Sequence, residues 1–95
     1  MLQELPRFVV EQRVPEMTSA DLAGLHSALT EAALRLSAES DHVACVRTIY
    51  VPSLERWMAV FEAETPDTVH RAAKIAQLPP AHVHQAIEMT ASRQR

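Results

Sequence analysis

Residues 42–63 read HVACVRTIYVPSLERWMAVFEA, and this stretch decides the fold. Two runs rich in β-branched and aromatic residues, 42–51 and 56–63, are separated by the four residues PSLE. Runs of this composition are typical of β-strands, and Pro52 ends the first because proline lacks the backbone N–H that a strand interior needs. The spacing predicts a β-hairpin in the middle of the chain.

An amphipathic helix is predicted on each side of this hairpin. Residues 18–40 begin with Thr18 and Asp21 in the capping-box pattern, and residues 65–77 begin with Thr65 as N-cap followed by Pro66. Gly24, the only glycine, lies inside the first helix, where we expect close contact with the sheet to explain it. The apolar stripes expected to be buried are Leu22, Leu25, Leu29, Ala32, Ala33 and Leu36 in the first helix and Val69, Ala72, Ala73 and Ala76 in the second.

Two further strands complete the pattern, RFVVEQRV at 7–14 and AHVHQAIEM at 81–89. The resulting order, βαββαβ, predicts an α+β ferredoxin-like fold, in which right-handed crossovers form a four-stranded antiparallel sheet of spatial order 4-1-3-2. Both helices then lie on one face of the sheet. The 95 residues predict a single domain, with its core at about residues 6–90.

Composition excludes several classes of function. The net charge is −3 and the Lys and Arg residues are scattered, which disfavours a nucleic-acid-binding surface. We expect no membrane segment and no signal peptide, because the apolar runs are too short. A single cysteine, Cys45, excludes an intrachain disulfide and favours a buried thiol in a cytoplasmic protein. A single glycine cannot build a phosphate-binding loop, so we expect no nucleotide cofactor.

The sheet face away from the helices is the predicted interaction surface. Side chains alternate between the two faces of a strand, so this face combines apolar and charged residues. We expect a second copy to pack against it, forming a homodimer with a cavity between the two sheets. The residues placed on this face are Val9, Met58, Val60 and Ala86, mixed with Glu11, Glu62, His84 and Glu88.

The candidate site lies on the same face. His82 and His84 are two residues apart on the last strand, so their rings point to the same side. With Glu11 and Glu62 from neighbouring strands, they are candidate ligands for a divalent metal such as nickel or zinc. Tyr50 joins these ligand-binding residues if its side chain faces the cavity.

Two other interpretations of these residues stay open. The imidazole and carboxylates could act as a general base and an orienting acid. Alternatively, they are polar residues of the surface and of an interface, linked by salt bridges to Arg7 and Arg13. An H-x-H pair is a weak signal because a metal site needs a third ligand from elsewhere.

The segments RFVVEQRVP, the YV before the hairpin, and VFEAETPDTVHRAAKIAQLPPAHV together resemble a small bacterial family, domain of unknown function 4242. The resemblance covers about residues 6–90 and implies a ferredoxin-like chain that dimerises into an α+β barrel. Some family members are described as nickel-binding. The family pattern has a histidine before the tyrosine of strand two, a cysteine in strand three and a histidine in helix two, where this chain has Thr48, Ala59 and Ala72.

The sequence therefore predicts a small homodimeric protein that binds a ligand or a divalent metal between its sheets. The alternative is a dimeric α+β barrel enzyme, namely an isomerase, cyclase or cofactor-free oxygenase, with His84 or Glu11 as the base in an apolar pocket. An amino-acid-sensing module of the same βαββαβ order ranks last. Such modules usually carry a glycine in the turn before the first helix, where this chain reads PEMTS.

Overall fold

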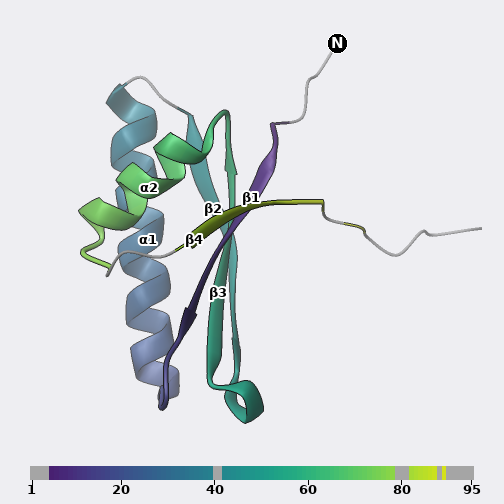
Figure 1. Cartoon of the computed structure of the whole chain (residues 1–95). Coiled ribbons are helices and arrows are strands. Elements are labelled where there is room, and N and C mark those ends of the chain that lie inside the picture. Colours follow the sequence, from purple (N-terminus) through teal and green to yellow (C-terminus); the bar gives the residue numbers. More distant parts are fainter. Residues whose placement is uncertain (1–4, 40–41, 79–81, 88, 90–95) are drawn as a thin grey trace, which may run out of the picture.

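The computed structural model describes residues 5–39, 42–78, 82–87 and 89 (Figure 1). The predicted order of strands and helices is confirmed. The elements are β1 (Arg7–Arg13), α1 (Ser19–Glu39), β2 (Val43–Val51), the short 3-10 helix η1 (Pro52–Leu54), β3 (Arg56–Ala63), α2 (Pro66–Ile75) and β4 (His82–Ala86).

The four strands form one antiparallel sheet of order β2-β3-β1-β4, which is the predicted 4-1-3-2 order. Both helices lie on the same side of the sheet, so the ferredoxin-like fold is confirmed (Figure 1). The last strand is shorter than predicted. β4 ends at Ala86, and Ile87 and Met89, which lie within the predicted strand 81–89, are exposed to solvent.

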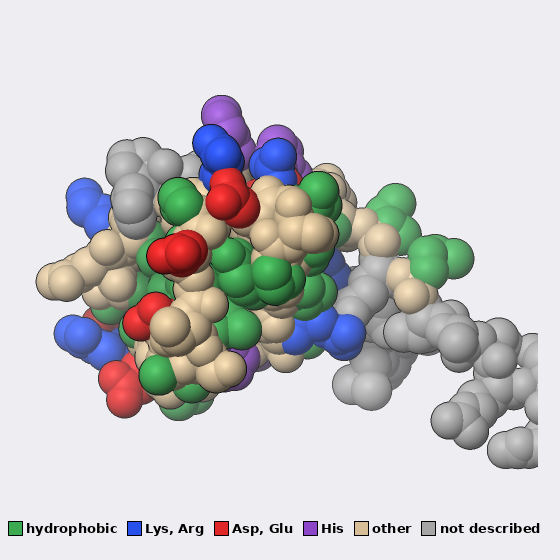
Figure 2. Space-filling view, turned by 90° about the horizontal axis from the view of Figure 1, so that it is seen from below, with side chains coloured by type: hydrophobic (Ala, Val, Ile, Leu, Met, Phe, Trp, Pro, Cys, Tyr) green, Lys and Arg blue, Asp and Glu red, His purple; other side chains and the backbone are tan. Residues whose placement is uncertain are grey.

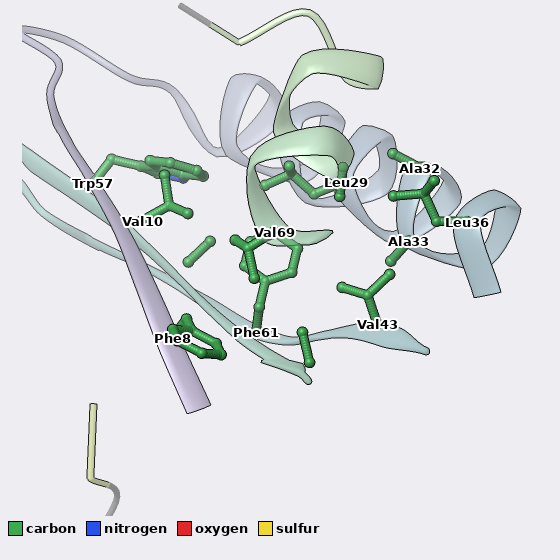
Figure 3. Packing of buried hydrophobic residues seen from close by; sticks show 13 residues of the cluster. Phe8, Val10, Leu29, Ala32, Ala33, Leu36, Val43, Trp57, Phe61 and Val69 are labelled. Carbon is green, nitrogen blue, oxygen red and sulfur yellow. The ribbon is translucent and has the colours of Figure 1, made fainter. Parts of the chain in front are cut away.

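The hydrophobic core fills the space between the sheet and the two helices (Figure 3). Alternate residues of the central strands supply its sheet side: Phe8 and Val10 from β1, and Trp57, Ala59 and Phe61 from β3. Trp57 and Phe61 are completely buried, and burial of a large apolar side chain contributes roughly 1.5–3 kcal/mol each. The predicted stripe of α1 is confirmed, since its buried residues are Leu29, Ala32, Ala33 and Leu36, with Leu22 and Leu25 partly buried against them.

The two helices begin differently, although both start after a threonine. At α1 the capping box is complete, because the Asp21 N–H donates to Thr18 Oγ1 at 3.0 Å and the Thr18 N–H donates to Asp21 Oδ2 at 3.1 Å. At α2, Thr65 has the extended N-cap conformation but its side chain makes no capping hydrogen bond. Its hydroxyl lies 3.2 Å from that of Thr68 instead.

The expectation for Gly24 was wrong. A Cβ at this position would meet nothing within 4 Å, so no contact with the sheet requires a glycine here. The residue is exposed within α1, and its backbone φ is negative. Nothing in the structure explains the choice of glycine.

A β-bulge interrupts β2. Pairing with β3 passes from Cys45↔Phe61 to Arg47↔Val60, which leaves Val46 as an extra residue. Because each extra residue changes which face the following side chains occupy, Arg47 and Ile49 lie on the face away from the helices. The bulge therefore determines which part of β2 belongs to each face.

Candidate functional site

The open face is the name used here for the sheet surface away from the helices. Its members alternate along the strands with the buried core residues. The predicted placement is confirmed for Val9, Glu11, Met58, Val60, Glu62, His84 and Ala86, whereas Glu88 lies outside the described residues. The remaining members are Arg7, Arg13, Ala44, Arg47, Ile49, Val51, Arg56 and His82.

The centre of the open face is apolar. Val9 of β1 pairs with Val60 of β3, and Met58 lies two residues before Val60 on the same strand. All three side chains are half-buried by their neighbours in the sheet alone. Ile49 of β2, which pairs with Met58, is 41% exposed and extends this apolar area toward the edge of the sheet.

Two arginine–glutamate ion pairs and a contact between His42 and Glu62 flank the apolar centre. Arg7 Nη2 lies 3.7 Å from Glu62 Oε2, and His42 Nε2 lies 3.2 Å from Glu62 Oε1. Arg56 Nη1 lies 3.1 Å from Glu11 Oε2. Both carboxylates of the predicted site are therefore balanced by arginine within the chain, and Arg7 is the partner that the interface interpretation expected.

Arg13 pairs elsewhere than expected. Its Nη2 donates to Glu55 Oε1 at 2.8 Å, at the end of the β2–β3 hairpin. Glu55 itself has a left-handed backbone conformation with φ of 52°, and its N–H donates to the Pro52 carbonyl at 3.0 Å. This pair fixes the turn against the end of β1 rather than adding to the candidate site.

The two histidines of β4 lie on the open face, as the H-x-H pattern predicted. The ring centroids of His82 and His84 are 5.9 Å apart, and the rings are tilted by 31°. The register makes His82 the cross-strand partner of Glu11 and His84 the partner of Val9. Cross-strand partners have Cβ atoms about 4.5–5.5 Å apart, so the sheet brings Glu11 next to this histidine pair.

Glu62 is not brought to the same place. It pairs with Arg7, whose partner on β4 is Ala86, so Glu62 lies across the sheet from the end of β4 rather than beside the histidines. Within the described ranges, no three or more His, Cys, Asp or Glu side chains already surround a common point where a metal could bind. The metal set of His82, His84, Glu11 and Glu62 stays a prediction. Of these four residues, His82, His84 and Glu11 lie close together in the sheet.

Tyr50 does not meet the condition for joining the site. It pairs with the buried Trp57 and packs against the core, and its hydroxyl donates to the Val14 carbonyl at 3.1 Å. Its side chain therefore belongs to the helix-covered side of the sheet. The β-bulge at Val46 is the physical reason, because it reverses the alternation of the first part of β2.

The three positions at which the sequence departs from the family pattern also lie on the helix-covered side. Thr48 pairs with Ala59, and Thr48 Oγ1 lies 2.9 Å from His26 Nδ1 on α1. Ala59 and Ala72 are completely buried. Thr48, Ala59 and Ala72 are thus separated by the sheet from His82 and His84.

Three residues near the site were missed by sequence reasoning. Alternation from Met58 would have placed Arg56 on the open face. The bulge concealed Arg47, and His42, which was included in the predicted strand 42–51, lies just before β2, which begins at Val43. The long-range pairing of His42 with Glu62 has no local signature in the sequence.

Cys45 is a poor candidate for a nucleophile. It packs against the core from β2, and burial raises the pKa of its thiol to about 11. The thiol is therefore protonated at neutral pH, which agrees with the expectation of a buried apolar residue.

Comparisons with protein-family models, with curated proteins and with solved structures found no match for this chain. Among the described residues, no helix is long and apolar enough to cross a membrane.

Proposed function

We propose that the protein is a homodimer formed through the open face, and that it binds a divalent metal ion or a small polar ligand at His82, His84 and Glu11. The observation that supports this most directly is the composition of the open face. Val9, Met58 and Val60 form an apolar centre that neither helix covers, because both helices lie on the other side of the sheet.

The ion pairs make this face suitable for burial in a dimer. Burial of an unpaired charge is strongly unfavourable, whereas Glu11 and Glu62 already have arginine partners in their own chain. Burial of the apolar centre contributes roughly 25 cal/mol for each Å² removed from water. A second copy of the same face supplies an apolar centre of matching size, as a symmetric dimer requires.

The histidine pair fits a borderline metal such as nickel or zinc. Imidazole nitrogens bind zinc at about 2.0–2.1 Å, so each ring centroid lies roughly 3 Å from a bound ion. Two rings with centroids 5.9 Å apart are within reach of one ion. Glu11 would complete a set of two histidines and one carboxylate, which leaves coordination positions for water, a substrate or the second copy. A bound ion would supply Lewis acidity and orient an anionic ligand.

Metal binding is tested by calorimetric titration of nickel and of zinc into chelator-treated protein. We expect saturable binding that is lost in His84→Ala, because one of the two imidazole ligands is removed. The matched control is His70→Ala, since His70 is exposed on α2 on the other side of the sheet. Absence of binding in the unaltered protein, or equal binding by His84→Ala, would contradict the metal site.

Dimerisation is tested by light scattering on a size-exclusion column. We expect the unaltered chain to elute as a dimer and Val60→Lys as a folded monomer, because the substitution buries an unpaired ammonium group at the centre of the interface. Leu34→Lys is the control, since Leu34 is 65% exposed on α1. A monomeric unaltered chain at every concentration tested would exclude the dimer.

A further inference from the structure

The ion pair of Arg56 reaches into the candidate site. Arg56 Nη1 lies 3.1 Å from Glu11 Oε2, and Arg56 is two residues before Met58, the cross-strand partner of Glu11 on β3. His82 is the partner of Glu11 on the other side, on β4. When the molecule is seen from the end that carries η1, histidine side chains lie next to basic and acidic side chains on one side of it (Figure 2). Glu11 therefore lies between a guanidinium group on one strand and an imidazole on the other.

The Arg56–Glu11 pair and the proposed metal site both use the carboxylate of Glu11. Two arrangements are compatible with this. Metal binding either takes Glu11 away from Arg56, or leaves one carboxylate oxygen to each of the two groups. The contact with Arg56 involves Oε2, so Oε1 is the oxygen left for an ion. Carboxylates that bind metals are themselves commonly held by a hydrogen bond from a neighbouring residue, which agrees with the shared arrangement.

Burial of the open face in a dimer also favours the shared arrangement. The side chains of Arg56 and Glu11 are 45% and 33% exposed in a single copy, and a second copy on this face would cover them further. A guanidinium group that loses its carboxylate inside an interface becomes an unpaired buried charge, which is strongly unfavourable. When the carboxylate is shared, Arg56 keeps its partner and Glu11 is held in one orientation.

We propose that Arg56 is a positioning residue for the metal site, which holds Glu11 through Oε2 and so keeps Oε1 in place for an ion beside His82 and His84. The inference rests on the proposed metal site and adds to it the residue that orients its carboxylate. The direct effect of the Arg56 charge on a divalent cation is repulsive. Any gain in metal affinity from Arg56 therefore has to act through Glu11, and this makes the proposal testable by the sign of the effect.

The sheet provides a matched control in Arg13. Arg13 is the cross-strand partner of Arg56 and lies two residues after Glu11 on β1, but it pairs with Glu55 at 2.8 Å. Replacement of either arginine by glutamine removes one positive charge from the same part of the open face and leaves one glutamate without that arginine. The two variants thus differ in which glutamate is released.

The first test is calorimetric titration of nickel into chelator-treated protein. Arg56→Gln should raise the Kd about 10- to 100-fold, the usual effect of removing a residue that orients a metal ligand. Arg13→Gln should leave the Kd unchanged or slightly lower, because only repulsion is removed. Arg56→Lys should recover part of the affinity, since it retains a charged donor. A Kd for Arg56→Gln that is equal to or below that of Arg13→Gln would overturn the proposal.

Both arginine variants should keep their fold. Ion pairs with exposed side chains contribute little to stability, and the side chains of Arg56 and Arg13 are 45% and 72% exposed. Thermal unfolding of the metal-free proteins should therefore give nearly the same midpoint for Arg56→Gln, Arg13→Gln and the unaltered chain. A difference between their nickel affinities then reports on the site and not on folding.

The second test is a double-mutant cycle between Arg56 and Glu11. Glu11→Gln keeps the length of the side chain but removes the charged ligand, so the addition of Arg56→Gln should raise the Kd no further. A further rise as large as in Arg56→Gln alone would mean that Arg56 acts by another route. That result would overturn the proposal and leave the metal site intact. Absence of nickel binding by the unaltered protein would reject the metal site and this inference together.

Discussion

Among single residues, Gly24 combines a high cost in helix stability with an exposed position in the middle of α1. The substitution Gly24→Ala should raise the free energy of unfolding by about 1 kcal/mol, because alanine loses less backbone entropy on folding and its Cβ meets nothing within 4 Å. Urea denaturation measures the change. The reverse substitution at the neighbouring exposed position, Ala23→Gly, should lower the free energy of unfolding by a similar amount. A destabilising Gly24→Ala would mean that α1 has an additional contact at this position.

Cys45 illustrates how burial controls reactivity at a single residue. Its pKa of about 11 lies about two units above the usual value of 9.0, so the thiolate fraction at neutral pH falls roughly 100-fold. Alkylation by iodoacetamide should therefore be slow in the folded protein and should accelerate on unfolding. Between pH 9 and 11 the unfolded chain loses the thiol proton before the folded chain does, so the free energy of unfolding falls as the pH rises through that window. Equal alkylation rates in folded and unfolded protein would contradict the burial of Cys45.

At the scale of secondary-structure elements, the two helix starts provide a matched comparison. Thr18→Ala should cost about 1 kcal/mol, because it removes the acceptor of the Asp21 N–H and leaves that donor without its capping partner. Thr65→Ala should cost less, because the Thr65 side chain makes no capping hydrogen bond. Thermal unfolding of both variants measures the difference. A larger loss at Thr65 would show that its hydroxyl contact with Thr68 is the stronger constraint.

The strands and helices themselves could be predicted because their signals are local. Alternation in RWMAVFEA identified the buried face of β3, and the spacing of Leu29, Ala32 and Leu36 identified that of α1. The bulge at Val46 could not be predicted, because it depends on pairing with β3 and leaves no pattern in the sequence. The bulge also places Tyr50 on the helix-covered side of the sheet, so the sequence could not predict that Tyr50 lies away from the candidate site.

The end of β4 was also beyond sequence reasoning. The apolar pattern of Val83, Ile87 and Met89 continues past Ala86, but the pairing with β1 ends at Arg7. A strand exists only as far as its neighbour pairs with it, and that limit is set by the register of two segments far apart in the chain.

For the whole molecule, topology determined more of the candidate site than composition did. The order βαββαβ requires both helices on one side, and this requirement together with the alternation of side chains along β1 and β4 placed Glu11 and His84 on the opposite face. Whether those side chains meet depends on register, which made Glu11 the neighbour of His82 and directed Glu62 toward Arg7 and His42. The sequence therefore predicted which face carries the polar groups, but not which of them are neighbours.

Trp57 is the only tryptophan in the chain, and it lies completely buried on β3 among core residues from the sheet and from α1. Its fluorescence consequently reports whether the helices remain packed on the sheet. The proposed metal and partner contacts lie on the opposite face, so their formation should leave the emission wavelength unchanged. A red shift in any variant would therefore indicate loss of the core rather than loss of binding. One optical signal thus separates a misfolded variant from one that has lost only its ligand or partner.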